Sequence, residues 1–400
     1  MTTTIETPTG AAQTMVLNMG PQHPSTHGVL RVILELNGEI VVKAEPVIGY
    51  LHTGIEKSCE AKTYSQAITL TDRIDYLAPL SNNLGYCLAV EKLLGIEVPK
   101  RAQYNRVLLT ELTRIASHLV WLGTHAIDLG AMSVFLYTFR EREEIMKIFE
   151  YVSGQRMMTS YFRIGGLALE PPPGFLDKVR RVMDALPGHV DEYEDLLTNN
   201  RIWLGRTQGV GIISADDAIA MGCSGPMLRG SGVAYDVRKA FPYSSYDDFN
   251  FEVQTQTAGD CFARYQVRVA EIRESIKIVR QAMERVAKAD GPIRTEAPGI
   301  IPPSREEMKT SIEGLIYHFK IYTEGFAPPP GEVYQVIESP RGELGFFVAS
   351  DGSAKPYRVK VRAPSFVNLQ SLPRLAVGRL IADVVACIGT TDIVLGEVDR

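Results

Sequence analysis

The sequence has 400 residues, of which 45% are hydrophobic and 22% are charged, so the chain can bury a substantial core. Its net charge of −5, without a basic cluster interleaved with aromatic residues, argues against a nucleic-acid-binding surface. No apolar run approaches the ~18 residues of a membrane-spanning helix, and residues 1–15 lack the features of a signal peptide. We therefore expect a soluble or peripheral protein with a flexible N-terminal arm over residues 1–15.

The stretch NMGPQHPSTHGVL (18–30) places His23 and His27 four residues apart, which is the spacing of a zinc-binding pair on a helix. Pro21 and Pro24 exclude a helix there, because proline removes a backbone donor and disfavours helical geometry in the residue before it. Without a glutamate between them, the two histidines also fail to complete an HExxH motif. The pair therefore does not predict a metal site.

Immediately downstream, residues 28–47 alternate loosely between apolar and polar side chains on both sides of Asn37-Gly38. Asn-Gly supplies the positive φ of a tight turn, so this pattern predicts a β-hairpin. His27 then lies on a loop at the start of a strand. There it either caps backbone groups or takes part in chemistry, whereas we interpret His23 as structural.

Helical spacing follows in residues 59–70 and 72–95, with Gly95 as a stop, and in 99–131, which is apolar on more than one side and so predicts a deeply buried helix. Thr138 and Glu141 have the spacing of a capping box for a helix that continues to about Ser153 and ends at Gly154. Residues 170–174 (EPPPG) break the chain, and two short amphipathic helices are expected from there to about Thr198.

The second half of the chain changes from helices to strands. Ser214 with Asp217 caps a short helix, residues 264–291 form a long helix, and Ser304 with Glu307 caps a helix to about Glu324. Residues 332–339, 343–350 and 357–363 predict three antiparallel strands, and a helix is expected near 376–388.

These patterns predict a mainly helical α+β protein with small antiparallel β pieces near both termini. We expect a single domain over residues 16–400. Within it we distinguish an N-terminal hairpin region (16–55), a helical core (56–325) and a C-terminal β/α region (326–400).

The cysteines are scattered, without a CxxC pair, and we interpret them as reduced intracellular thiols packed as small apolar residues. They offer no conventional four-cysteine ligand set for an iron–sulfur cluster. No GxGxxG follows a strand and no P-loop is present, so the sequence gives no support for nucleotide binding. The five residues are Cys59, Cys87, Cys223, Cys261 and Cys387.

Several stretches together resemble one family over about residues 16–400, essentially the whole chain. They are GPQHPSTHGVLR, GYLHTGIEK, DRIDY, HFKIYTEGF, SPRGELGFFVASDG and KVRAPSFVNLQ. The chain resembles the quinone-binding, 49-kilodalton-type subunits of respiratory complex I, a family related to the large subunits of nickel–iron hydrogenases. The resemblance therefore implies a hydrogenase-large-subunit-like helical core.

The hydrogenase relation can be tested on the metal ligands. Hydrogenases hold nickel and iron with two cysteine pairs, and this sequence has Asp75 and Ala78 where the first pair would stand. Val394 and Glu397 stand at the second pair, and Arg400 stands at the neighbouring histidine. All four thiolates that would select such metals are missing. The resemblance thus implies an old metal cavity put to another use, with no metal bound, and an active hydrogenase is excluded.

In the family, the residues that match His27 and Tyr76 reach the quinone headgroup. Reduction of a quinone adds two electrons and two protons, so hydrogen-bond donors at the two carbonyl oxygens would stabilise the developing charge. Asp128 matches the carboxylate that pairs with this histidine, and Thr124 and Ala78 would line the quinone cavity. The plain alternatives are that Tyr76 is a core aromatic residue and Asp128 a buried hydrogen-bonded acid.

The resemblance also implies partners, because the chain has no electron donor of its own. Electrons would come from a 4Fe–4S cluster on the neighbouring B-type subunit, with Arg73 beside that cluster, unless Arg73 simply pairs with Asp72 or Asp75. Met158 stands where some relatives carry a histidine linked to the pH dependence of the cluster potential, so that coupling is in doubt. His118 and His125 are expected to be core or interface residues, and a functional role for His52 is left open.

The expected partners are the B-type and C-type subunits of complex I, other peripheral-arm subunits and membrane-arm subunits, but no nucleic acid. NAD, FMN and Fe-S clusters would belong to partner subunits, and quinone would be the substrate. The expected location is the cytoplasmic side of the bacterial inner membrane, as a peripheral protein. Two functions remain. The chain is either a subunit that reduces quinone in concert with proton translocation by membrane subunits, or a non-catalytic scaffold of a hydrogenase-related membrane complex.

Overall fold

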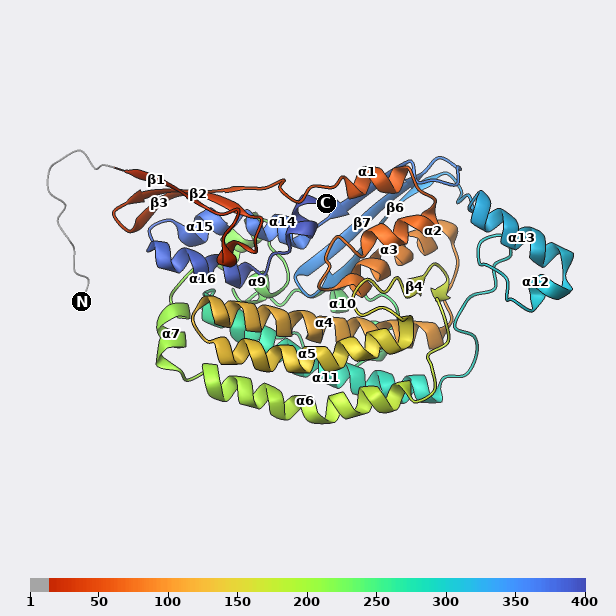
Figure 1. Cartoon of the computed structure of the whole chain (residues 1–400), viewed down its shortest axis with the longest axis horizontal. Helices are drawn as coiled ribbons and strands as arrows, with labels where there is room; N and C mark the ends of the chain where they lie inside the picture. The colour runs from red at the N-terminus through yellow and green to blue at the C-terminus, as the bar shows by residue number, and fades with distance from the viewer. Residues whose placement is uncertain (1–13) are drawn as a thin grey trace.

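The computed structural model describes residues 14–400, so almost all of the arm expected over residues 1–15 lies outside the described part. Long helices form the centre, and a small antiparallel sheet lies near each end of the chain (Figure 1). The predicted mainly helical α+β class is confirmed. No helix within residues 14–400 combines the length and the apolar character needed to cross a bilayer.

The N-terminal sheet has strand order β1 (Met15–Met19), β2 (Arg31–Asn37) and β3 (Ile40–Val47), all antiparallel. The predicted hairpin is confirmed, with Gly38 at a φ of 63° in the turn. Strand β1 was not predicted. Between β1 and β2 the chain forms a single 3₁₀ turn, η1 (Pro24–Thr26), rather than an α-helix.

Five helices follow: α1 (Ile55–Glu60), α2 (Tyr64–Thr71), α3 (Pro79–Leu94), α4 (Lys100–Asp128) and α5 (Met132–Ser153). The buried helix expected over 99–131 is confirmed as α4, and Gly95 ends α3 as predicted. The helix expected over 72–95 was wrong in its first turn, because residues 72–78 form a turn and the helix begins only at Pro79, a residue suited to a first helical position.

The capping box predicted at Thr138 and Glu141 is also wrong. Helix α5 begins six residues earlier, at Met132, and the Thr138 hydroxyl donates to the Phe135 carbonyl oxygen within the helix (3.1 Å). The predicted end at Gly154, with a φ of 77°, is confirmed. A capping pattern in the middle of an amphipathic sequence therefore did not outweigh the apolar periodicity that begins upstream of it.

Residues 175–198 form one helix, α6 (Phe175–Leu197), instead of the two short helices that were expected. Pro187 lies inside it and cannot donate a backbone hydrogen bond to the Met183 carbonyl oxygen. The Arg280 guanidinium donates to that oxygen instead, at 2.8 Å. A side chain from another helix thus satisfies the acceptor that the proline leaves free, and the helix continues.

Short elements connect α5 to the C-terminal sheet: β4 (Phe162–Arg163), β5 (Gly166–Leu167), α7 (Arg201–Thr207), α8 (Ala215–Ala220), α9 (Pro226–Arg229), α10 (Val237–Ala240) and the 3₁₀ turn η2 (Tyr246–Asp248). Ser214 caps α8 as predicted by accepting from the Asp217 amide. The long helix expected over 264–291 is α11 (Cys261–Lys288).

The helix expected from Ser304 to about Glu324 is divided into α12 (Glu307–Thr310) and α13 (Ile312–Thr323). Ser304 accepts from the Glu307 amide as expected, but Ser311 interrupts the helix and caps α13. The two helices project from the molecule at the end opposite the N-terminal sheet (Figure 1).

The C-terminal sheet consists of β6 (Gly331–Ser339), β7 (Gly342–Ser350) and β8 (Arg358–Arg362), antiparallel with β7 in the middle, which confirms the three predicted strands. Helices α14 (Pro364–Leu369), α15 (Leu372–Ala376), α16 (Ile381–Thr391) and α17 (Leu395–Asp399) follow, where only one helix near 376–388 was expected.

The two ends of the sequence meet in the fold. The Val41 amide of β3 donates to the Arg379 carbonyl oxygen (2.9 Å), and the Gly378 amide donates to the Val41 oxygen (2.8 Å). Apolar residues of the N-terminal sheet share one buried cluster with α15, α16 and α17. The C-terminal segment is thereby held between the N-terminal sheet and the central helices, so residues 72–78 and 392–397 can reach one another.

Candidate functional site

The turn over residues 72–78 presents Tyr76. Asp75 fixes this turn because its carboxylate oxygen Oδ1 accepts from the backbone amides of Leu77 (3.0 Å) and Ala78 (3.2 Å). The Asn82 side chain donates to the Asp75 carbonyl oxygen at 3.0 Å, which ties the turn to helix α3. Tyr76 follows Asp75 directly and is half-buried, so the ring is held by a rigid support without being sealed in the core.

The guanidinium of Arg341, from the turn between β6 and β7, is the centre of a buried charged cluster. It donates from Nη1 to Asp75 Oδ2 (2.6 Å) and to Ser117 Oγ (2.9 Å), and from Nη2 to Asp392 Oδ1 (3.3 Å). Burial would lower the pKa of Arg341, but the carboxylates of Asp392 and Asp75 outweigh burial and hold it above its usual value. A permanent cation thus joins three distant segments of the chain.

Glu397 of α17 is the third buried carboxyl group beside this cation. Its Oε2 accepts from the Ser365 amide at 3.0 Å, whereas Oε1 has no hydrogen-bond partner among the described residues. Burial, and then the neighbouring charge of Asp75, raises the pKa of Glu397 to about 7. Burial likewise raises the pKa of Asp392, although Arg341 opposes this shift. The cluster therefore holds carboxyl groups that tend to keep a proton.

Asp75 and Glu397 thus both interact with one arginine, and Ala78 and Val394 are also buried. In residues 14–400 no group of three or more His, Cys, Asp or Glu side chains is arranged to hold a metal ion. Asp75 and Glu397 therefore present carboxyl groups to a fixed cation, an arrangement that can stabilise charge.

His27 ends the η1 turn with a left-handed φ of 55°, and its amide donates to the Pro24 carbonyl oxygen (3.2 Å). His23 begins the same turn in an extended conformation and accepts from the Ser25 amide at Nδ1 (3.2 Å). The two histidines therefore do not share a helical face, as predicted from the prolines. The cap that His23 supplies agrees with its structural interpretation.

Arg341 contributes to the electrostatics of both His27 and Tyr76. Desolvation, followed by the positive charge of Arg341, lowers the pKa of His27 to about 4, so its imidazole is neutral near pH 7. Burial and Asp75 raise the pKa of Tyr76, and Arg341 acts in the opposite direction. Both side chains lie within electrostatic range of the Arg341 guanidinium, and both are partly exposed.

Asp128 ends helix α4, and the residues of the η1 segment that influence its pKa are Ser25 and His23. Burial raises the pKa of Asp128, while a hydrogen bond with Ser25 and the charge of His23 oppose this shift. Within residues 14–400 no ion pair of 4.0 Å or less joins Asp128 to His27. The predicted Asp128–His27 pairing therefore remains a prediction.

Thr124, also on α4, is partly buried and donates its hydroxyl to the Val120 carbonyl oxygen at 2.9 Å. Arg73 is exposed and donates to the Thr69 carbonyl oxygen at 2.9 Å. The alternative ion pairs for Arg73 are not formed, because Asp75 binds Arg341 and Asp72 accepts from the Ser160 hydroxyl. Arg73 thus remains on the surface next to the Tyr76 turn.

Comparison with known proteins decides the family. The family described as "Respiratory-chain NADH dehydrogenase, 49 Kd subunit" matches residues 128–400. A protein of Solibacter usitatus, named as a D-type subunit (D 1) of NADH-quinone oxidoreductase, is 66% identical, over 96% of this chain and 94% of the relative. The chain belongs to the 49-kilodalton-subunit family of respiratory-chain NADH dehydrogenases. As a member of that family it is a subunit of an oxidoreductase complex.

Other relatives match over similar lengths. A second D-type subunit (D 2) of NADH-quinone oxidoreductase, from Koribacter versatilis, is 63% identical over 98% of this chain and 97% of its own length. The D-type subunit from Geotalea uraniireducens is 60% identical over 98% of this chain and 100% of its own length. The similarity thus covers His27 and Tyr76 as well as the segment matched by the family.

Three further histidines of this family member have structural partners. His52 contacts the Asp399 carbonyl oxygen at 2.7 Å, so it fastens the GYLHTG segment to the C-terminus. His118 contacts the Glu271 carboxylate at 2.9 Å inside the core. His125 is buried and stacks on Trp121 with ring centroids 5.3 Å apart. Core positions for His118 and His125 agree with the prediction.

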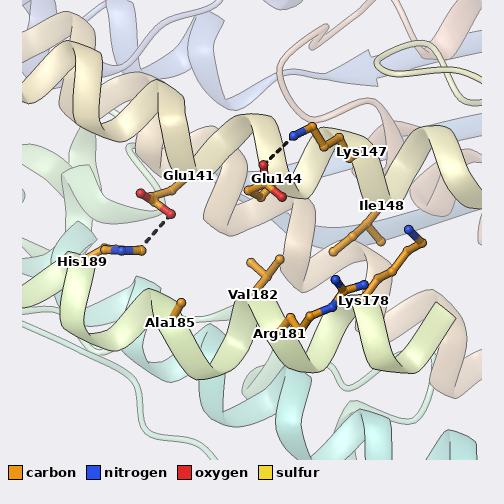
Figure 2. Close-up of a pocket in the computed structure, with 9 residues that line it drawn as sticks. All are labelled: Glu141, Glu144, Lys147, Ile148, Lys178, Arg181, Val182, Ala185 and His189. Atoms are coloured by element: carbon orange, nitrogen blue, oxygen red, sulfur yellow. Dashed lines mark hydrogen bonds and ion pairs between the residues drawn. The ribbon is translucent and has the colours of Figure 1, made fainter. Parts of the chain in front are cut away.

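A cavity of about 340 Å³ lies away from these residues, between helices α5 and α6 (Figure 2). Its walls are mostly charged, and His189 Nδ1 lies 2.8 Å from a Glu141 carboxylate oxygen while Lys147 pairs with Glu144 at 2.6 Å. None of the side chains predicted to bind quinone lines it.

Sequence analysis missed Arg341 and Asp392 as site residues. The SPRGELG motif that contains Arg341 was part of the family resemblance, and Asp75 and Glu397 had been singled out as replaced cysteines. Two acidic residues that lie close together in the core need a compensating cation. The combination of Asp75 and Glu397 could therefore have led to Arg341. All five cysteines of the chain are buried and unpaired, and no iron–sulfur ligand set forms among them.

Proposed function

We propose that this chain carries the quinone-reducing site of a proton-pumping NADH:quinone oxidoreductase, with His27 and Tyr76 binding the quinone headgroup. The observation that carries the proposal is the shared Arg341 cation. It influences the pKa of both side chains, and it donates to the carboxylate of Asp75, the residue next to Tyr76. A fixed positive charge next to two hydrogen-bond donors stabilises the negative charge that a quinone gains on reduction.

Each of the two donors has a defined protonation state before the quinone is reduced. Tyr76 is a neutral phenol because its pKa is raised by burial and by Asp75, and His27 is a neutral imidazole because its pKa is lowered to about 4. Each can therefore donate one hydrogen bond to a quinone carbonyl oxygen. As electrons arrive, each oxygen becomes more basic, and Tyr76 can give its proton to one of them. Neutral His27 keeps its single N–H as a hydrogen-bond donor and passes a proton on only after it has gained a second one. Arg341 then stabilises the tyrosinate that remains.

Asp128 would supply this second proton to His27 in the assembled complex, so that His27 returns to its neutral form when it protonates the quinone. This role requires a rearrangement of the contacts described above, because Asp128 faces Ser25 and His23. Ser25, His23 and His27 belong to one turn, so a small movement of η1 would exchange one partner for another. Thr124 and Ala78 would line the cavity, and the Thr124 hydroxyl, already bound to its own helix, would present its methyl group to the ring.

The electrons would come from a 4Fe–4S cluster on the B-type subunit, and NAD, FMN and the other Fe-S clusters would also belong to partner subunits. Arg73 supports contact with the B-type subunit because it is exposed, adjoins the Tyr76 turn and pairs with neither Asp72 nor Asp75. Met158 has no ionisable side chain, so this position would not make the cluster potential depend on pH. The C-type subunit and membrane-arm subunits complete the assembly, on the cytoplasmic side of the bacterial inner membrane.

A scaffold role without catalysis is the second candidate. The observation that favours it is helix α13, where Ile312, Phe319 and Tyr322 are 73%, 64% and 66% exposed. Large apolar side chains on a projecting helix are typical of a surface that contacts other proteins. A scaffold predicts that substitutions at His27 and Tyr76 alter assembly alone.

The two functions are separated by His27→Ala and Tyr76→Phe in the assembled complex. We expect NADH:quinone reductase turnover per complex to fall about 10²-fold or more, since each variant removes one donor at a developing charge. Reduction of a hydrophilic acceptor that takes electrons upstream should stay normal. Tyr357→Phe, the same change on a 70% exposed tyrosine, is the matched control. Undiminished quinone turnover in both site variants would reject the catalytic proposal.

A further inference from the structure

The charged cluster around Arg341 contains more acids than bases. Asp75, Asp392 and Glu397 face two cations, Arg341 and Arg268, and the Arg268 Nε lies 3.9 Å from Asp392 Oδ2. With all five of these groups ionised, they would together carry one net negative charge. One proton removes this excess, and desolvation favours that neutral arrangement.

Glu397 is the acid with the fewest compensating contacts. Asp75 has an ion pair of 2.6 Å and two backbone amides, and Asp392 has ion pairs with both arginines. Glu397 is completely buried and receives one hydrogen bond, from the Ser365 amide, and its Oε1 has no partner within residues 14–400. The proton that the cluster can accept therefore belongs on Glu397.

The helix that carries Glu397 also packs against the turn that carries Tyr76. A Cβ atom on the preceding residue, Gly396, would lie 2.8 Å from the Ile74 carbonyl oxygen and 3.3 Å from the Tyr76 ring atom Cδ1. Helix α17 thus packs directly on the turn that presents the tyrosine. Arg341 interacts electrostatically with both Glu397 and Tyr76, so it connects the two acids.

We propose that Glu397, by holding or releasing one proton, controls how strongly Arg341 stabilises negative charge on Tyr76. Neutral Glu397 leaves the Arg341 charge available to the tyrosinate that forms when Tyr76 protonates the quinone. Ionised Glu397 competes for the same cation and makes that proton harder to give. Glu397 is a positioning residue, because it acts through Arg341. This inference rests on the proposed function of Tyr76.

The charges that face Glu397 come from two segments, with Asp75 in the 72–78 turn and Arg341 in the β6–β7 turn. Asp392, from the segment after α16, faces Arg341. On its own helix, Asp399 is occupied by the backbone amides of Gly49 and Leu51, and the Arg400 guanidinium lies over the Phe366 ring. Burial and Asp75 raise the pKa of Glu397 to about 7, so its proton exchanges near neutral pH.

The pH profile of quinone turnover tests this role in the assembled complex. Wild-type turnover should fall as pH rises above about 7, by up to about tenfold per pH unit, because ionised Glu397 withdraws Arg341 from Tyr76. Glu397→Gln cannot ionise, so it should keep its plateau into the alkaline range. Glu397→Asp keeps an ionisable group and should restore an alkaline decline. An alkaline decline in Glu397→Gln equal to that of wild type would overturn the proposal, as would a uniform loss at every pH.

A second variant covers the case in which Glu397→Gln does not assemble. Asp75→Asn removes the neighbouring charge that raises the pKa of Glu397, so the alkaline decline should begin at a lower pH than in wild type. A decline at an unchanged pH would reject the proposal. Failure of the Glu397 proposal can be distinguished from failure of the proposed quinone site. Normal quinone turnover in Tyr76→Phe and His27→Ala would reject the site. Slow turnover in both variants, together with a pH profile of Glu397→Gln that equals that of wild type, would reject the role of Glu397 alone.

Discussion

The two predicted quinone ligands are held in different ways. Tyr76 lies on a turn whose support comes from far along the chain, through Arg341, Asp392 and Gly396. His27 lies on a turn supported by its own neighbours within residues 21–30. One side of the site depends on a buried ion network, and the other depends on local backbone hydrogen bonds.

The difference implies different sensitivities. A buried network fails cooperatively, because loss of one partner leaves other charges without compensation. A local turn loses only the hydrogen bond that was removed. Substitutions far from the quinone site should therefore disturb the Tyr76 turn strongly. The backbone of the His27 turn should respond to changes within its own loop, although the pKa of His27 also depends on Arg341.

The largest effect is expected from Arg341→Ala. It leaves Asp75 and Asp392 buried without their ion-pair partner, which should reduce the free energy of unfolding by about 3–5 kcal/mol. Arg374→Ala is the control, because Arg374 pairs with Asp217 at an exposed site, where the loss should be about 0–1 kcal/mol. Denaturant unfolding of the purified variants measures both. Similar losses would show that the network does not support the Tyr76 turn.

Gly396→Ala should break the contact between α17 and the Tyr76 turn. The added Cβ would meet the carbonyl oxygens of Ile74 and Arg73 at 2.8 and 2.9 Å, so we expect a loss of about 1–3 kcal/mol together with reduced quinone turnover. Gly205→Ala is the control within helix α7, since nothing lies within 4 Å of its added Cβ. That control should be neutral or stabilising. A stable, fully active Gly396→Ala would contradict the packing argument.

The two regions should respond to pH with opposite signs. His27 has a folded pKa of about 4 against about 6.5 unfolded, so the unfolded chain binds more protons and stability is lost as pH falls through this range. Glu397 has a folded pKa of about 7 against 4.5, so the folded chain binds more protons and stability is lost as pH rises from 4.5 through 7.

Each contribution is at most about 1.4 kcal/mol per pH unit, and less for His27 because that residue is partly exposed. His27→Asn, which suits the left-handed backbone, should make the unfolding free energy less sensitive to acid. Glu397→Gln should make it less sensitive to base. Unfolding free energies of both variants between about pH 5 and 8 give the slopes. Slopes that change in the same direction would refute the assignment.

The smallest effect is expected in the local turn. The buried Thr26 hydroxyl donates to the His23 carbonyl oxygen at 2.9 Å, so Thr26→Val should cost about 1 kcal/mol. It should also weaken quinone binding, seen as a higher KM, without affecting the alkaline pH profile. Thr310→Val, at an exposed threonine that bonds within its own helix turn, is the control. A loss as large as that of Arg341→Ala would mean that the turn is not locally supported.

Sequence patterns predicted the elements whose signals are local and continuous. Helix α4, the Asn37-Gly38 hairpin and the three C-terminal strands follow from periodicity and turn residues alone. Predictions from these patterns were wrong where tertiary contacts determine the local structure. Pro187 remains in a helix because Arg280 supplies the missing bond, and residues 72–78 form a turn because Asp75 binds their amides.

The site shows the same division. His27 and Tyr76 were found through the resemblance to a family, and the replaced cysteine positions pointed to Asp75 and Glu397. The sequence could not show that Arg341, 266 residues from Asp75, lies between them. Nor could it show that Asp128 faces Ser25, since helix position alone does not determine which residue of the η1 turn it meets.

The most direct measurement is labelling of the assembled complex with a quinone that carries a photoreactive group on its headgroup. We expect light to attach the label to two peptides of this chain, one containing His27 and one containing Tyr76, and excess unmodified quinone to prevent both. Labels on neither peptide, with competition intact elsewhere in the complex, would contradict a quinone site between these two turns.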